Sequence, residues 1–102
     1  MLGVELFVCK QPTLIVENLS AEEMQRCRYE NHGFDHDAHV DAFKQIYEII
    51  DQEVRTDRVI DLTPLSGRPE LFHDHIHPTS EGAARVAEIV ASVLSARLSY
   101  VP

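Results

Sequence analysis

Apolar residues recur at helical spacing in two stretches of the chain. In the stretch from Ala38 to Arg55, they follow one another at intervals of three and four residues: Val40, Phe43, Ile46, Tyr47, Ile50 and Val54. The second stretch follows Thr79 or Ser80, either of which can cap a helix. Its apolar face holds Val86, Ile89, Val90, Val93, Leu94 and Leu98. This spacing is typical of amphipathic helices, so we predict one helix in each stretch.

Two shorter apolar runs are rich in β-forming residues. The first extends from Leu2 to Cys9 and is stopped by the polar residues that lead to Pro12. The second extends from Arg58 to Leu62 and stops before Pro64. Runs of this length between turn-forming residues are typical of strands, so we predict that both runs form buried strands.

The order of these elements indicates the fold class. Between the first strand and the first long helix, residues Thr13 to Asp37 show no clean period, apart from a short helix predicted to start at Ser20 with Glu23 as its capping-box partner. Strand, long crossover with helix, strand, loop and helix is the order of an α/β fold with a parallel sheet. Two strands are too few for an independently stable sheet, so we expect residues 1–102 to be one domain that lacks some of its strands.

Composition narrows the class of protein. The chain has 102 residues, 44% of them hydrophobic and 25% charged, close to the globular average. Its formal net charge is −8 and its nine basic residues are scattered, so a nucleic acid would be repelled. No apolar run approaches the roughly 20 residues that span a bilayer, and the first residues lack the features of a signal peptide. We therefore expect a cytoplasmic protein without a membrane span.

The segment from Phe72 to Ala84, FHDHIHPTSEGAA, holds the most informative chemistry. Asp74 precedes His77 by three residues, and both stand just before the second helix. On a turn, this spacing lets the carboxylate accept the Nδ1 hydrogen of the imidazole, which leaves Nε2 free as a base. We therefore predict that Asp74 and His77 are the acid and base of a hydrolase triad.

DHIHPTSEG followed by an amphipathic helix resembles the last sequence block of the SGNH (GDSL-like) hydrolases. In that family an Asp-x-x-His pair, often followed by Pro and by a Gly in the first helical turn, supplies the acid and base. Pro78 and Gly82 match these positions. The preceding helix and the strand RVIDL also come in the family's order, so the resemblance covers nearly all of this chain but about the C-terminal half of a usual family domain.

The resemblance implies part of a three-layer α/β/α, flavodoxin-like fold and an activity toward small acyl esters, without a cofactor. It also implies a serine nucleophile in a Gly-Asp-Ser block and an oxyanion hole that uses a Gly-x-Asn block. Neither block occurs in this sequence. None of its four glycines begins one: Gly3, Gly33, Gly67 and Gly82. We therefore expect the chain to provide the catalytic His-Asp pair and to obtain its nucleophile from a missing N-terminal segment.

Two other functions fit parts of the sequence. The histidines and carboxylates around His77 could bind a metal, as could a second group near the first long helix, although neither has a standard ligand spacing. The two groups are His73, Asp74, His75 and His77, and His32, Asp35, His36, Asp37 and His39. In a further alternative, the chain is a non-enzymatic module that forms a homo-oligomer through an open sheet edge.

Cys9 and Ser66 carry nucleophilic groups. Cys9 lies in an apolar strand, which favours a buried structural thiol. Ser66 lies in a loop without a Gly-x-Ser-x-Gly elbow, which favours a structural role.

Overall fold

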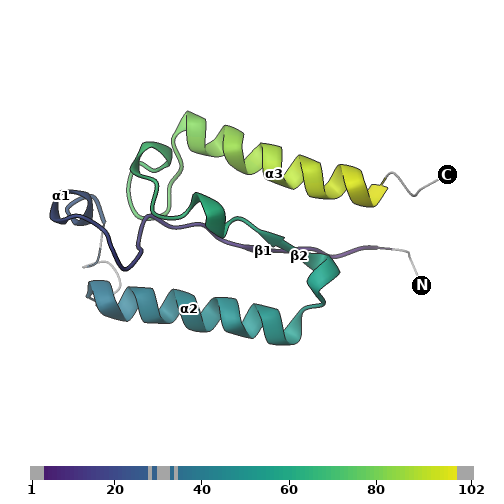
Figure 1. Ribbon diagram of the computed structural model, residues 1–102, viewed down its shortest axis with the longest axis horizontal. Helices are drawn as coiled ribbons and strands as arrows, with labels where there is room; N and C mark the ends of the chain where they lie inside the picture. Colours follow the sequence, from purple (N-terminus) through teal and green to yellow (C-terminus); the bar gives the residue numbers. More distant parts are fainter. Residues whose placement is uncertain (1–3, 28, 30–32, 34, 99–102) are drawn as a thin grey trace.

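The computed structural model describes residues 4–27, 29, 33 and 35–98. Within them, three helices and a small two-stranded parallel sheet form a mixed α/β structure (Figure 1). The elements are β1 (Val8–Lys10), α1 (Ala21–Met24), α2 (His36–Glu53), β2 (Val59–Asp61) and α3 (Ser80–Leu98). Single 3₁₀ turns lie at Thr56–Arg58, Thr63–Leu65 and Pro69–Leu71. Leu2, Gly3 and His32, to which we assigned roles from the sequence, and the side chain of Leu98 lie outside the described part.

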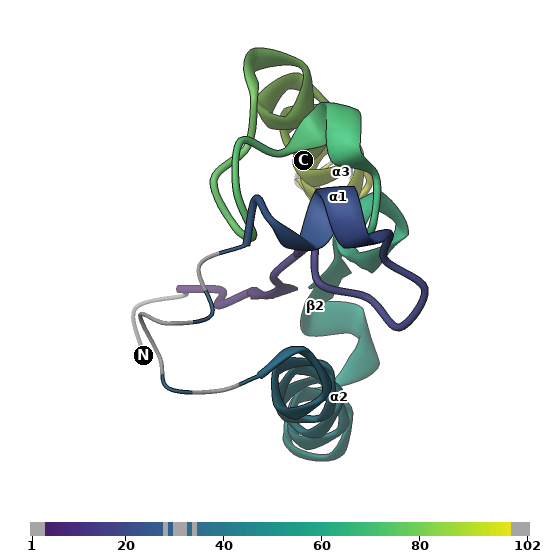
Figure 2. The ribbon, with the colours of Figure 1, turned by 90° about the vertical axis from the view of Figure 1, so that its left-hand side faces the viewer.

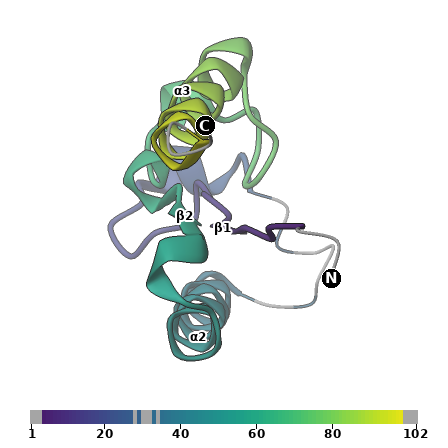
Figure 3. The ribbon, with the colours of Figure 1, turned by 90° about the vertical axis from the view of Figure 1, so that its right-hand side faces the viewer.

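The two strands pair in parallel, as the order of elements predicts. Val8 lies opposite Val59 and Lys10 opposite Asp61. Seen along the strands, α2 and α3 lie on opposite sides of this pair (Figure 3), with α2 in contact with β1 and α3 with β2. Of the predicted strand from Leu2 to Cys9, residues 4–7 are not part of the sheet, because β2 offers only three residues for pairing, opposite Val8 to Lys10.

The long helix α2 confirms the first predicted helix, with its start two residues earlier. The Asp35 side chain accepts a hydrogen bond from the Ala38 amide at 2.9 Å and caps the helix. Val40 is buried, but Ile46, which we placed on the same apolar face, is 49% exposed. That part of the prediction was wrong, because the surface that would cover Ile46 is absent from the described part.

The other two helices begin at the caps that the sequence predicts. At α1, Ser20 and Glu23 form a reciprocal capping box. At α3, the Thr79 hydroxyl accepts from the Gly82 amide at 3.1 Å. Figure 2 shows α1 in front of the gap between the two long helices, at the end of the molecule to which the strands point. This end carries the loops that follow both strands.

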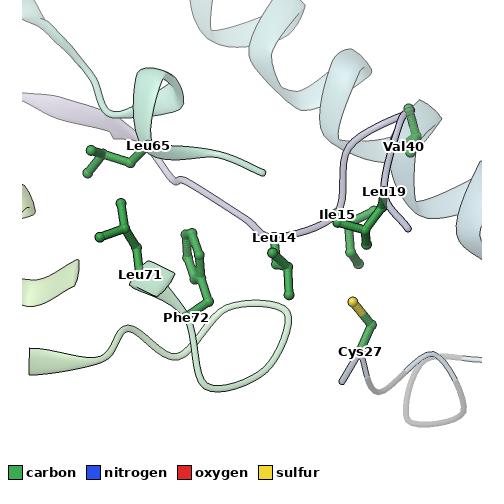
Figure 4. Packing of buried hydrophobic residues seen from close by; sticks show 8 residues of the cluster. All are labelled: Leu14, Ile15, Leu19, Cys27, Val40, Leu65, Leu71 and Phe72. Atoms are coloured by element: carbon green, nitrogen blue, oxygen red, sulfur yellow. The ribbon is translucent and has the colours of Figure 1, made fainter. Parts of the chain in front are cut away.

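The hydrophobic core lies mainly among these loops. It consists of Leu14, Ile15, Leu19, Cys27, Val40, Leu65, Leu71 and Phe72 (Figure 4). Most of these residues follow a strand or precede α3, and α2 contributes only Val40. The core therefore holds the carboxyl ends of the strands together with the turn that carries Asp74 and His77.

Cys9 contradicts the buried position that we predicted for it. The residue is exposed, although its register partner Ile60 is buried. An apolar run alone did not guarantee cover, because α3 packs on β2 and no described element covers Cys9 on the neighbouring strand.

Candidate active site

A tight turn between Leu71 and Thr79 carries the predicted acid and base. Phe72 and Pro78 face each other in an antiparallel bridge. Inside it, the His73 amide donates to the His77 carbonyl at 2.8 Å, and outside it the Thr79 amide donates to the Leu71 carbonyl at 2.9 Å. These bonds close the turn and fix the backbone of Asp74 and His77.

Asp74 and His77 meet as the spacing predicts. Nδ1 of His77 lies 2.8 Å from Oδ2 of Asp74 and 3.1 Å from Oδ1. Oδ1 also accepts hydrogen bonds from the amides of Ile76 (3.0 Å) and His77 (2.8 Å). Nε2 of His77 makes no hydrogen bond to any residue that the structure describes. The imidazole is thus held at one nitrogen and open at the other.

The surroundings keep Asp74 ionised. Partial burial acts to raise the pKa of its carboxyl, but the hydrogen bonds from the His77 and Ile76 amides and from the His77 imidazole outweigh it and hold the pKa well below the ordinary value of 3.8. An ionised carboxylate can only accept hydrogen bonds, so Nδ1 of His77 must be the donor. Nε2 of a neutral His77 then carries the lone pair that a general base needs.

The two side chains differ in exposure. The Asp74 side chain is 19% exposed, whereas that of His77 is 71% exposed. The carboxylate therefore belongs to the fixed part of the turn and the imidazole faces solvent. The described residues alone do not exclude water from the base, so a working hydrolase site needs a second surface over His77.

The turn is anchored to the segment that follows β1, a contact that the sequence did not predict. The His75 carbonyl accepts hydrogen bonds from the Thr13 hydroxyl at 2.8 Å and from the Leu14 amide at 2.9 Å. The same hydroxyl accepts from the Ile15 amide at 3.1 Å, and Thr13 is almost fully buried. Thr13 thereby fixes the turn relative to the carboxyl end of β1.

Arg26 provides a second anchor. Its guanidinium donates to the carbonyl of Pro69 at 3.0 Å and to the carbonyl of Phe72. The Pro69 carbonyl lies before the turn and the Phe72 carbonyl at its start, so one charged side chain holds both ends of the Pro69–Phe72 segment. Neither Arg26 nor Thr13 belongs to a local motif, and only the folded chain brings them to the turn.

Gly82 brings α3 against the base of the turn. A Cβ atom at this position would lie 2.1 Å from the Leu71 carbonyl oxygen. Only glycine permits this approach. The Gly82 that we noted in the sequence therefore has a steric role, in which it seats the first turn of α3 directly beside the segment before Asp74.

An apolar cavity of about 140 Å³ adjoins the turn. Ile76 and Pro78, the neighbours of His77 on either side, both line it. The remaining lining residues come from the ends of both strands, the core and α3: Gln11, Pro12, Leu62, Leu65, Leu71, Phe72, Gly82 and Val86. The cavity can accept a small apolar group beside the turn, although neither Asp74 nor His77 lines it.

The other candidate residues do not gather at this site. His75 is buried and turns toward α2, where its ring centroid lies 6.5 Å from that of His39. Nδ1 of His36 lies 2.6 Å from the Tyr29 hydroxyl oxygen. Within the described part of the chain, no three His, Cys, Asp or Glu residues are placed to hold a metal ion.

The candidate nucleophiles lie apart from His77. The Ser66 hydroxyl accepts a hydrogen bond from the Thr13 amide at 3.1 Å, which gives this serine a structural contact. None of the described residues brings a hydroxyl or thiol within hydrogen-bond distance of His77.

Comparisons of this chain with protein-family models, with curated proteins and with solved structures find no match. Among the residues with described positions, no helix is long and apolar enough to cross a membrane.

Proposed function

We propose that this chain carries the acid–base half of a serine ester hydrolase site of the SGNH (GDSL-like) type. The observation that carries the proposal is the contact of the Asp74 carboxylate with Nδ1 of His77 at 2.8 Å, with Nε2 left open. The resemblance of DHIHPTSEG to the last block of that family supports it. The placement of α2 and α3 on opposite sides of a parallel strand pair agrees with a partial three-layer, flavodoxin-like fold.

In the proposed reaction, a serine hydroxyl attacks the carbonyl carbon of an acyl ester while Nε2 of His77 takes the hydroxyl proton. Asp74 orients the imidazole and stabilises the imidazolium that forms. The C–O bond to the alcohol then breaks, and His77 returns the proton to the leaving oxygen. A water molecule releases the acid from the acyl-serine by the same proton transfers.

The apolar cavity that Ile76 and Pro78 line favours an acyl group as the part of the substrate that this side of the turn holds. Its volume of about 140 Å³ is close to that of an engineered protein cavity of about 150 Å³ that binds benzene. Small acyl esters are therefore the substrate class that fits. Because the sequence contains no Gly-Asp-Ser block, the serine and the oxyanion donors are proposed to come from a further polypeptide segment.

Hydrolysis of a chromogenic acetate ester tests this proposal. The assay compares this chain with a chain extended by the residues encoded upstream of Met1. We expect turnover only by the extended chain. In that chain, His77→Ala should lower kcat by about three orders of magnitude or more, because the base is lost.

His73→Ala is the matched control, since His73 is an exposed histidine of the same turn and its side chain has no part in the pair. It should leave the rate within about twofold of wild type, the scale of an exposed substitution that makes no catalytic contact. Unchanged turnover in the His77→Ala variant, or turnover by neither wild-type chain, would contradict the proposed function.

A further inference from the structure

The two lysines of the sequence, Lys10 and Lys44, line the same hollow, which has a volume of about 460 Å³. Lys10 is the last residue of β1, and Lys44 lies on α2. The hollow extends from α2 to the loops that follow both strands, where Thr63 is part of its wall. Ligand pockets have volumes of about 300–1,000 Å³, and open α/β sheets bind their ligands outside the carboxyl ends of the strands. The size and position are therefore those of a small-molecule site.

The two lysines differ in their exposure. The Lys10 side chain is 13% exposed, and its Nζ lies 2.7 Å from Oδ1 of Asp51 on α2. The Lys44 side chain is 56% exposed and forms an ion pair with Glu17, which belongs to the loop after β1. Lys10 therefore provides a positive charge on the inner wall of the hollow, and Lys44 provides one at its rim.

Apolar side chains line the hollow together with these amines. Ile15 and Val40 are buried members of the core (Figure 4), and Val16 packs against the core. All three belong to the lining and are called the apolar wall below. A ligand in this hollow meets an apolar surface and two positive charges, which suits a molecule with a charged group and an apolar body.

Three hydroxyl groups of the lining donate their hydrogen bonds within the protein. Tyr47 donates to the Gln11 carbonyl, and Thr63 donates to Oδ1 of Asp61 at 2.6 Å. Thr13 donates to a carbonyl of the tight turn at 2.8 Å. A hydroxyl has one proton to donate, whereas an ammonium group has three. The donors that a ligand can use therefore come chiefly from the two lysines, and charged donors bind anionic acceptors most strongly.

The charge of the hollow differs from that of the whole chain. The described residues that line it include two basic side chains and one acidic side chain, that of Glu17. The chain as a whole has nine basic and 17 acidic residues and a formal net charge of −8. This surrounding charge opposes the approach of an anion, and it opposes a doubly charged anion more strongly than a singly charged one. A monoanion is therefore the charged ligand that suits the hollow best.

We propose that the hollow binds a small monocarboxylic acid in its ionised form. The carboxylate contacts the ammonium groups of Lys10 and Lys44, and the body of the ligand packs against the apolar wall. The ion pair of Lys44 with Glu17 is exposed on both sides, and such pairs are weak, so it does not bar the carboxylate. The inference does not depend on the proposed hydrolase function, because neither Asp74 nor His77 lines the hollow.

Nuclear magnetic resonance of the chain with ¹³C-labelled lysine tests the site, because each of the two lysines then gives its own Cε signal. Benzoate is the probe, since a protein cavity of about 150 Å³ already holds a benzene ring. We expect benzoate to shift both signals in a saturable way, with a Kd of about 1 mM. Benzamide has the same ring without the charge, and inorganic phosphate has charge without the ring. Both should bind at least roughly tenfold more weakly than benzoate.

Lys44→Gln removes the charge at the rim, and Arg85→Gln is the matched control, because it removes a half-exposed positive charge on α3. Lys44→Gln should raise the Kd for benzoate roughly tenfold, whereas Arg85→Gln should leave it within about twofold of wild type. The Lys10 signal reports binding in both variants. Circular dichroism verifies that both retain their helices, which is expected because neither side chain is buried.

The wild-type titration alone can overturn the proposal. Lysine signals that show no saturable shift with benzoate would mean that the hollow does not bind a carboxylate. Equal Kd values for benzoate and benzamide would show that the charge is not recognised, and phosphate binding as tight as that of benzoate would show that the apolar wall is not. Equal Kd values in the two variants would remove Lys44 from the site and contradict the proposal as well.

Discussion

The carboxylate of Asp74 links the stability of the turn to its chemistry. It accepts hydrogen bonds from two amides of the turn and from the His77 imidazole, so the same interactions that orient the base also close the loop. These are charge-assisted bonds of the stronger kind. Loss of the charge at this position should therefore affect folding as well as catalysis.

Asp74→Asn should lower the free energy of unfolding at pH 7 by about 1–3 kcal/mol, the usual value of hydrogen bonds to a charged group. The pKa of Asp74 is lower in the folded chain than in the unfolded chain, so its contribution is fully present above about pH 5. The contribution is lost as the pH falls through about 4 toward the folded-state pKa. Urea unfolding at several pH values should therefore show the gap between wild type and variant shrinking in acid.

Asp41→Asn is the matched control for this measurement, since Asp41 is an exposed carboxylate on α2. It should change the free energy of unfolding little at any pH. A gap for Asp74→Asn that stays constant from neutral to acid pH would show that ionisation of Asp74 does not stabilise the turn.

Some contacts of the candidate site could be predicted from the sequence and others could not. Asp74 and His77 stand three residues apart, so their contact is local and could be predicted from spacing. The Thr13 hydroxyl meets the His75 carbonyl across 62 residues, and Arg26 reaches Phe72 across 46. Contacts of that kind depend on the packing of loops and leave no periodic trace in the sequence.

The positions of the helices and strands agree with those that the hydrophobic pattern predicts. The predictions failed where no described element packs against the predicted surface. The capping residues Ser20 and Thr79 were predictable because their bonds are local. The length of β1 and the burial of Ile46 were mispredicted, because both depend on whether another element lies alongside. A periodic pattern tells which face is apolar, but it does not supply the surface that covers it.

Substitution of Gly82 by alanine tests whether the first turn of α3 lies directly against the segment before Asp74. In an open helix, Gly82→Ala would raise stability by about 1 kcal/mol through helix propensity. Here the added Cβ would clash with the Leu71 carbonyl oxygen, so we expect a net loss of about 1–3 kcal/mol in thermal or urea unfolding. The exposed Ala84→Gly in the same helix gives the propensity effect alone. A Gly82→Ala variant more stable than wild type would rule out the close approach.

The whole molecule is more extended than a compact domain of its length. Its radius of gyration is 15.6 Å, against about 13 Å for a compact domain of 100 residues. The sequence predicted this shortage of partners, because only two strand-like runs accompany the two amphipathic helices. It did not tell which surface would be left open. The structure leaves Val4 and Leu6 before β1, and Ile46 and Ile49 of α2, exposed.

The tautomer of His77 tests the acid–base pair most directly, and the 102-residue chain suffices for the measurement. At a pH where the imidazole is neutral, long-range ¹H–¹⁵N correlation spectra distinguish a protonated ring nitrogen from an unprotonated one. We predict that His77 carries its proton on Nδ1 and that Asp74→Asn brings both tautomers into exchange, because Asp74 accepts the Nδ1 hydrogen. A wild-type His77 with its proton on Nε2, or a spectrum that Asp74→Asn leaves unchanged, would contradict the assignment of His77 as the base.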